Sequence, residues 1–346
     1  MNEGGTSMNI IGRRKLLYPV GDALNAYLKA HDRAAKLPLS YEDLLRFEGL
    51  MPQYDAKGKE TLWNTVLLRP QEQAETHQRL VETYQLLVSE GRHIDHLQVA
   101  GIDLCPYGNS RPFRIKILNK LNDNHDYFYV KRTDASRVYG LELEHHLSPY
   151  IINYLVEGVT LVEEHIIGVP GDTFIEDPSR YGGEMSAVRL CKEFVKFNER
   201  CFVRLLGDMR AYNFVVDVIH DLDQVQYRIR TIDLDQQSHE GRLRIYLPQF
   251  YKENLPYVTL AQRVIGQETA DQYRNEERSL LRRRRKLAQE ALDELLRVMG
   301  DDEIAPAANV VELAGELAAH HKDASFKEQR GMGDLLALHL RHCLDQ

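Results

Sequence analysis

Long apolar runs are missing from this sequence of 346 residues, and no stretch reaches the ~18 residues that a membrane span requires. The four cysteines are too few and too scattered for a disulfide framework or a zinc site, so we expect buried thiols. Residues 1–7 are small and polar and lack the apolar centre of a secretory signal. These absences predict a cytoplasmic protein without membrane contact.

An excess of positive charge is also missing. The formal net charge is −8, whereas a general nucleic-acid binder is usually basic. Residues 282–286 form one basic run, which by itself would favour nucleic-acid binding. Glutamates lie on both sides of this run in the same helical stretch. Such mixed charge is typical of a solvated helix face, and we expect no nucleic-acid partner.

The first 95 residues are predicted to form a helical N-terminal extension. Apolar residues recur at helical spacing in residues 21–28, 41–47 and 71–90, and Ser40 is a plausible helix N-cap. Gly91 ends the third of these helices. No residue of this region carries an evident catalytic role.

Strand-forming residues dominate the next part of the chain, and turn-forming segments separate them. Three successive strands joined by tight turns predict an antiparallel meander. A helix is expected at 135–147 before Pro149, and another at 186–204, and the chain is mostly helical after Gly241. The expected strands cover residues 96–104, 113–118, 127–131 and 160–167.

The most informative motif begins at Asp208, which is followed five positions later by Asn213. A stretch of strand formers comes next, and a second apolar stretch then ends in Asp233. Phosphoryl transfer uses one carboxylate to orient a hydroxyl, and an amide with another carboxylate to hold Mg²⁺. Taken alone, an Asp and an Asn at this spacing are equally typical of a polar turn.

The order Asp-x4-Asn, hairpin, apolar-Asp resembles the catalytic loop and metal-binding strand of the protein-kinase-like superfamily. Because Gly207 precedes Asp208 where protein kinases have His-Arg, the motif is most similar to the aminoglycoside-phosphotransferase branch. The resemblance covers roughly residues 96–240. It implies an α+β, bilobal fold, with a small β-rich nucleotide-binding lobe at 96–167 and a mostly helical large lobe at 168–346.

Within this resemblance, Lys131 ends a strand in the manner of the kinase lysine that binds nucleotide phosphates. A glutamate of the following helix is expected to hold it, and Glu142 and Glu144 are both candidates. They point about 160° apart on a helix, so only one can face the lysine. The adjacent histidines His145 and His146 also point apart and do not fit a zinc motif.

Two further parts of a nucleotide site are expected from the resemblance. The turn around Gly108 is the candidate phosphate loop, although it lacks a three-glycine pattern and is equally consistent with a plain β-turn. The strand at 160–167 is expected to line the adenine pocket. Its end supplies the hinge candidates Glu164, His165 and Ile166, which would act through backbone groups.

The resemblance assigns Asp208 to the acceptor hydroxyl and Asn213 and Asp233 to Mg²⁺. Arg210 is a candidate for neutralising the transferred phosphoryl group, or else a surface arginine. Asp235 binds a second metal or caps the next turn. The sequence leaves both pairs of alternatives open.

These assignments predict an ATP- and Mg²⁺-dependent phosphotransferase that acts on a hydroxyl group. No Ala-Pro-Glu motif follows Asp233, which favours a small-molecule acceptor over a protein. One alternative is a pseudokinase or nucleotide-regulated scaffold, as the degenerate phosphate loop would suggest. A second is an α+β interaction protein that binds no nucleotide.

Overall fold

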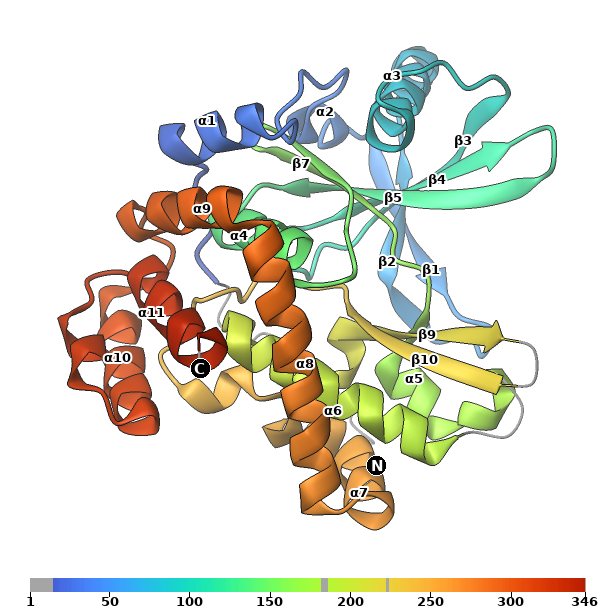
Figure 1. Cartoon of the computed structure of the whole chain (residues 1–346). Helices are drawn as coiled ribbons and strands as arrows, with labels where there is room; N and C mark the ends of the chain where they lie inside the picture. Colours follow the sequence, from blue (N-terminus) through green and yellow to red (C-terminus); the bar gives the residue numbers. More distant parts are fainter. Residues whose placement is uncertain (1–14, 182–185, 222–223, 346) are drawn as a thin grey trace, which may run out of the picture.

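The computed structural model describes residues 15–181, 186–221 and 224–345. Residues 1–14, 182–185, 222–223 and 346 lie outside this part. The architecture is α+β: a seven-stranded antiparallel sheet lies at one end and a mostly helical part at the other (Figure 1). Within the described residues, no helix combines the length and apolar character needed to cross a membrane.

The larger sheet has the strand order β1-β2-β3-β4-β5-β7-β6, with antiparallel neighbours throughout. The predicted meander is confirmed as β3, β4 and β5, and the predicted strand at 160–167 is confirmed for residues 160–164, as β7. The strands are β1 (Gly49–Tyr54), β2 (Glu60–Leu67), β3 (Leu97–Leu104), β4 (Phe113–Asn119), β5 (Asn124–Arg132), β6 (Tyr154–Glu157) and β7 (Thr160–Glu164).

The prediction of a helical N-terminal extension is wrong in part. Helices α1 (Asp22–Ala30), α2 (Tyr41–Leu44) and α3 (Pro70–Ser89) are present, but β1 and β2 between them extend the sheet. The stretch Glu60–Leu67 contains two threonines, a valine and the chain's one tryptophan, which favour a strand. Gly58, at φ +75°, makes the turn that joins the two strands.

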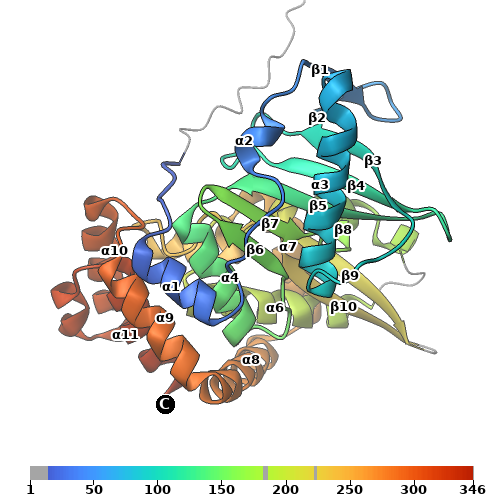
Figure 2. The same ribbon diagram turned by 90° about the horizontal axis from the view of Figure 1, so that it is seen from above.

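The two faces of the larger sheet differ in chemistry. Alternate residues of β4 and β5, including Ile115 and Phe128, are buried in an apolar core with α2 and α3. The intervening residues, among them Arg114, Tyr129 and Lys131, lie on the opposite face. Seen from above, α3 crosses the sheet, and α1 lies beside α9 (Gln289–Asp301) (Figure 2). The polar face is therefore the one available for a site.

A second apolar core joins α4 (Ala135–Leu147) to the rest of the chain. Around it lie α6 (Ala187–Arg204), α8 (Gln267–Leu287) and α9. The predicted helices at 135–147 and 186–204 are both confirmed. The remaining helices are α5 (Gly171–Glu176), α7 (Leu255–Val264), α10 (Ala307–His321) and α11 (Met332–Leu344).

The smaller sheet carries the hairpin that the sequence predicts. Strands β9 (Phe214–Asp221) and β10 (Gln224–Thr231) pair antiparallel, and β8 (Val169–Pro170) lies on the other side of β9. Gly171 begins α5 directly against this sheet. A Cβ at this position would lie 2.2 Å from the ring of Phe214, so only glycine fits.

The basic run of α8 is not simply a solvated face. Three of its arginines are half-buried and donate hydrogen bonds to backbone carbonyls. Arg282 reaches the Leu344 carbonyl and Arg285 that of Leu340, at distances of 2.6 and 3.4 Å. Leu344 is the last residue of α11, where carbonyls lack intrahelical partners, and Leu340 lies one turn before it. The basic run of α8 therefore stabilises the packing of α11 against α8.

Candidate active site

The loop between α6 and β9 contains the Asp-x4-Asn motif and is closed by local hydrogen bonds. Asp208 has a φ of 56°, a left-handed conformation that aspartate tolerates better than most residues. Its N–H donates to the Tyr251 hydroxyl at 3.0 Å. The Asn213 amide nitrogen donates to the Asp208 carbonyl at 2.7 Å. This bond fixes the amide, so its oxygen is the atom left for a cation.

The Asp208 carboxylate is half-buried and paired. Arg210 Nε donates to it at 2.7 Å, and Arg210 Nη1 donates to Glu253 at 3.2 Å. Burial raises the pKa of Asp208 above its usual value, and the charge of Arg210 offsets this only in part. A raised carboxylate pKa at an accessible position suits a group that receives or orients a proton.

The motif lies next to the acids that follow β10. The Ile232 N–H donates to the Asn213 carbonyl at 3.1 Å, so the hairpin brings Asn213 beside the start of the acidic segment. Within that segment, the Asp235 N–H donates to Asp233 Oδ1 at 3.0 Å. Two carboxylates and an amide oxygen are therefore collected at the base of one hairpin, the oxygen chemistry that Mg²⁺ prefers.

Helix α4 packs directly on this acidic segment. The Ser136 hydroxyl lies 3.2 and 2.8 Å from the carbonyl oxygens of Asp235 and Gln237. Gly140 permits the close approach, because a Cβ there would lie 3.0 Å from Leu234 Cβ. The first turn of α4 is thus held against the acids.

Arg137, in that first turn, joins the acids to the sheet. Its Nη1 lies 2.9 Å from Asp233 Oδ1 and 2.8 Å from Asp235 Oδ1. Its Nη2 donates to Glu163 of β7 at 2.7 Å, and its Nε donates to the other oxygen of that carboxylate. Lys131 Nζ donates to Glu163 at 2.6 Å. We call these five residues the Arg137 network.

The predicted pairing of Lys131 with a glutamate of α4 is wrong. Glu142 accepts hydrogen bonds from Tyr27 and Tyr154 and pairs with Arg33, and Glu144 pairs with Arg204. The sheet register explains why Glu163 takes their place. Tyr129 lies directly opposite Glu163, so Lys131, two residues on, is its diagonal neighbour on the same face.

The charges of the Arg137 network shift one another's pKa values. Burial alone would raise the pKa of Glu163, but Arg137 and Lys131 outweigh it and lower the pKa to about 2. The pKa of Asp233 is raised by burial and by the Asp235 carboxylate. That of Asp235 is lowered, because Arg137 overcomes the effect of burial. Three acids against two cations leave one negative charge in excess.

The polar face of the larger sheet adds aromatic rings that the sequence alone did not single out. The Arg114 guanidinium lies 4.4 Å from the centre of the Trp63 ring and pairs with Asp103 at 2.7 Å. The Tyr129 hydroxyl lies 3.1 Å from His165 Nδ1. Alternation along β4 and β5 could have indicated this face, but the part played by Trp63 depends on a strand that was not predicted.

The candidate hinge residues lie where the two sheets are connected. Strand β7 ends at Glu164 and β8 begins at Val169. The Glu164 side chain accepts a hydrogen bond from Asn153 at 2.8 Å, His165 contacts Tyr129, and Ile166 is buried. The connection is in the expected place, and whether it binds a nucleotide stays a prediction.

The turn around Gly108 is fixed by hydrogen bonds within the turn and to two other segments of the chain. Arg111 N–H donates to the Gly108 carbonyl at 3.2 Å, and the Tyr41 hydroxyl donates to the Arg111 carbonyl at 3.0 Å. The Arg132 N–H donates to the Ser110 carbonyl at 3.1 Å, which ties the turn to the end of β5. The turn is therefore bonded to the residue that follows Lys131, and whether it binds phosphates stays a prediction.

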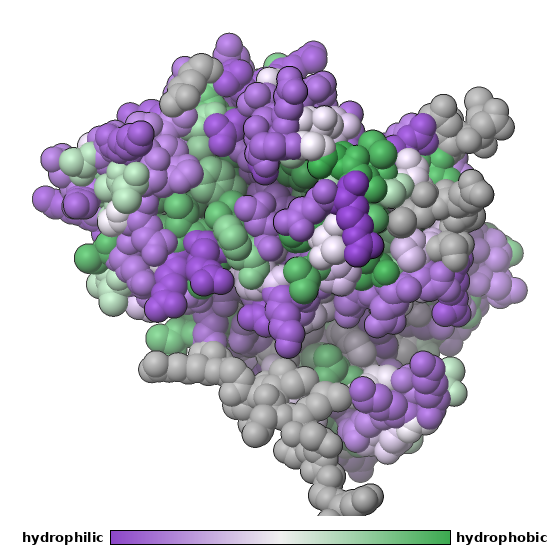
Figure 3. All heavy atoms as spheres, turned by 90° about the horizontal axis from the view of Figure 1, so that it is seen from below, coloured by the Kyte–Doolittle hydropathy of each residue, from purple (hydrophilic) through white to green (hydrophobic). Residues whose placement is uncertain are grey.

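A hollow of about 300 Å³ lies elsewhere, between α6, α7 and the start of α8. Its lining includes Phe194, Asn198, Phe250 and Ile265, and none of the Arg137 network. Figure 3 views the molecule from the side of α7, where apolar side chains gather between hydrophilic ones. The hollow therefore lies apart from the acids that follow β10.

His239, four residues after Asp235, gives this segment a pH-dependent stability. It is buried and donates to the Ile304 carbonyl at 2.9 Å, and burial, with the charge of Lys15, lowers its pKa to about 4. Unfolded histidine has a pKa near 6.5, so the unfolded chain binds the extra proton between these values. The stabilising contribution is therefore complete above pH ~6.5 and is lost as pH falls towards 4, by at most roughly 1.4 kcal/mol per pH unit.

We expect His239→Asn, whose amide can donate to the same carbonyl, to flatten the dependence of stability on pH between about 4.5 and 6. Urea unfolding at several pH values measures this slope. A variant with the wild-type slope would show that His239 does not titrate on unfolding.

No family model matches this chain, and a search of curated proteins finds no match.

Proposed function

We propose that the chain is an ATP- and Mg²⁺-dependent phosphotransferase with a bilobal, protein-kinase-like arrangement. One observation carries the proposal: the Asp208–Asn213 loop, the acids after β10 and the lysine of β5 converge at one place, although they are far apart in sequence. Arg137 pairs with Asp233 and Asp235 and, through Glu163, connects both acids to Lys131, an arrangement that a simple polar turn would not require. The convergence supports phosphoryl transfer over that simpler interpretation.

The proposed roles follow from the chemistry of each group. Lys131 supplies positive charge for nucleotide phosphates, and Glu163 positions it. Asn213, Asp233 and Asp235 offer oxygen ligands that fit Mg²⁺, which stabilises phosphate charge when bound. Asp208 orients the acceptor hydroxyl, and Arg210 positions the Asp208 carboxylate.

The segment after Asp235 favours a small acceptor. Gln237 is buried and donates to the carbonyl of Arg204 at 2.5 Å, and Asn254 is buried and donates to that of Met209 at 2.8 Å. The chain between these residues is therefore packed against the body instead of forming an extended platform for a peptide. We infer that the acceptor is a small molecule with a hydroxyl group.

A second candidate, nucleotide binding without transfer, is favoured by the contacts of Arg137. Its guanidinium pairs with both Asp233 and Asp235, the acids that would bind the metal. A cation already placed there lowers the electrostatic gain from a second one. In a pseudokinase, Arg137 would take the place of the metal permanently.

Thermal unfolding with ATP, ADP and GTP, each with and without Mg²⁺, separates these possibilities. A ligand that binds only the folded chain raises the unfolding temperature. We expect ATP with Mg²⁺ to give a larger shift than ATP alone, and radiolabelled ATP to transfer phosphate in a screen of small hydroxyl compounds. A shift without Mg²⁺ dependence or transfer supports the pseudokinase, and no shift with any nucleotide refutes both.

Lys131→Met is expected to weaken ATP binding at least tenfold while the chain still folds. The side chain is buried, but Glu163 keeps both hydrogen bonds from Arg137 after the lysine is lost. Calorimetric titration with ATP and Mg²⁺ measures the affinity. Lys116→Met is the matched control, because Lys116 lies on the same face of the neighbouring strand. Equal effects of the two substitutions would remove Lys131 from the site.

A further inference from the structure

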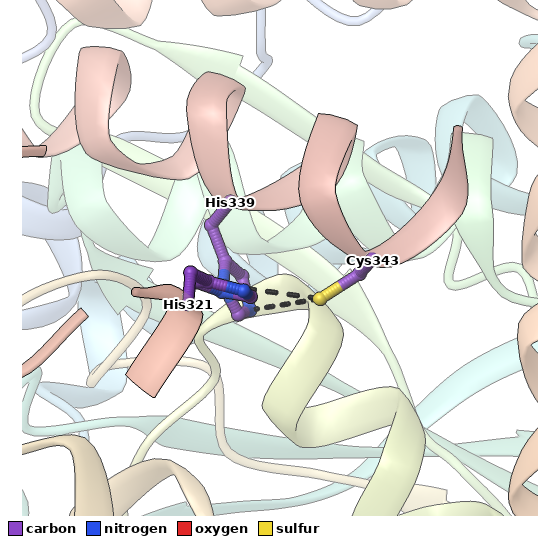
Figure 4. Close-up of side chains that lie close together, drawn as sticks. All are labelled: His321, His339 and Cys343. Carbon is purple, nitrogen blue, oxygen red and sulfur yellow. Dashed lines mark hydrogen bonds between the residues drawn. The ribbon is translucent and has the colours of Figure 1, made fainter. Parts of the chain in front are cut away.

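Three side chains that can bind a metal meet where α10 and α11 pack together. His321 is the last residue of α10, and His339 and Cys343 lie one helical turn apart on α11 (Figure 4). One ligand atom from each lies within 4.8 Å of the others. His339 and Cys343 are buried, and His321 is half-buried. The site is distant in sequence from the Arg137 network.

The ring of His339 is oriented by a bond outside the cluster. Its Nε2 lies 3.0 Å from the Phe202 carbonyl, and because a carbonyl only accepts, this nitrogen carries the proton. Nδ1 therefore has the lone pair, and it faces His321 Nε2 at 2.9 Å. A histidine that binds a metal commonly donates its second nitrogen to a backbone carbonyl in this way.

The protonation states also suit metal binding. Burial lowers the pKa of His339 to about 3 and that of His321 to about 4, so both rings are neutral at pH 7. Burial raises the pKa of Cys343 to about 12. The thiol is therefore protonated by itself, and metal binding must release its proton to solvent.

We propose that His321, His339 and Cys343 bind one zinc ion, which ties the end of α10 to α11. Tetrahedral zinc with bonds of about 2.0–2.1 Å to nitrogen and 2.3 Å to sulfur separates two nitrogens by about 3.4 Å and nitrogen from sulfur by about 3.6 Å. The corresponding distances here are 2.9 Å between the histidines and 3.9 Å from Cys343 Sγ to His339 Nδ1. The third pair, Cys343 Sγ and the His321 nitrogen, lies within 4.8 Å, so shifts of up to about 1.2 Å bring the three atoms to coordination distance.

His321 takes the tautomer with its proton on Nδ1 when zinc is bound, and its ring stays stacked on Phe326, whose centroid lies 5.1 Å away. A solvent molecule from the half-buried side of His321 fills the fourth position. His342, also beside His321, is held by Asp323 at 2.8 Å and stays outside the coordination sphere. Cysteine spacing gave no sign of this site because histidines supply two of the three ligands.

Cobalt(II) is the probe that tests the proposal, because it replaces zinc and reports a thiolate ligand by a charge-transfer band in the near ultraviolet. Tag-free, reduced, full-length chain is treated with a chelator, desalted and titrated with cobalt(II). We expect one equivalent to produce the band together with the strong visible absorption of tetrahedral cobalt. Zinc is then expected to displace the cobalt and to raise the unfolding temperature by several degrees.

Cys343→Ala is expected to abolish the charge-transfer band, and His339→Asn to weaken cobalt binding at least tenfold. Cys201→Ala is the matched control, since Cys201 is an equally buried thiol in α6. His342→Gln, outside the coordination sphere, is expected to keep the band. If wild-type chain gives no such band, or Cys343→Ala keeps it, His321 and His339 form a hydrogen-bonded pair beside an inert thiol and the proposal is overturned.

Discussion

Asp208→Asn is expected to reduce phosphoryl transfer by about 10²–10⁴-fold and to leave ATP binding near the wild-type value. Loss of a well-placed proton-accepting or orienting carboxylate typically has an effect of this size. The amide keeps an oxygen for Arg210, which donates to the carboxylate at 2.7 Å. Asparagine also tolerates the left-handed φ of 56° at this position. The substitution therefore removes charge and basicity with little change in the loop.

Initial rates of transfer at saturating ATP, together with the ATP affinity, measure the effect. Asp172→Asn, an exposed aspartate in the first turn of α5, is the control for a general loss of negative charge. Comparable turnover in wild type and Asp208→Asn would remove Asp208 from the mechanism and favour the pseudokinase.

The sheet strands and α4 were predictable because their signals are local. In β4, Phe113, Ile115 and Ile117 alternate with polar residues, and this pattern specifies both a strand and its buried face. Strands β1 and β2 were missed because their neighbours in sequence are helical. Strands β1 and β2 pair with each other, and only β2 joins them to the rest of the sheet, through a long-range contact with β3, which begins at residue 97.

The candidate site was likewise predictable only where its residues lie close together in the sequence. Asp208 and Asn213 lie in one loop, and a hairpin joins them to Asp233, so sequence order was enough to bring them together. The partner of Lys131 was not predictable in this way. It depends on the register between β5 and β7, which places Glu163 beside Lys131 and which the sequence alone does not specify.

Arg137 was overlooked for a related reason. A single arginine in the first turn of a helix is ordinary in a sequence, and only the packing of α4 on the acidic segment gives it three carboxylate partners. The cost of burying such a charge is offset only if its partners are well placed. The contacts of Arg137 therefore hold α4 and the acids in a fixed arrangement.

The two acids beside Arg137 are expected to respond differently to the same substitution. Asp233 keeps 37% of its side chain exposed, whereas Asp235 keeps 7%. The exposed carboxylate is the one that Mg²⁺ can reach, and Mg²⁺ usually takes only one or two protein carboxylates. We expect Asp233→Asn to lose the Mg²⁺-dependent part of ATP binding and all transfer, and to lose less than about 1 kcal/mol of stability.

Asp235→Asn, in contrast, is expected to cost on the order of 2 kcal/mol of stability, because it removes a buried charge partner from Arg137. Urea unfolding measures the stability of both variants, and calorimetric titration with ATP, with and without Mg²⁺, measures the metal effect. Each variant is the control for the other, since both remove one negative charge beside the same guanidinium. An unchanged Mg²⁺ effect in Asp233→Asn would refute the metal assignment, while a stability loss shared equally by both would show that the two acids serve only to hold Arg137.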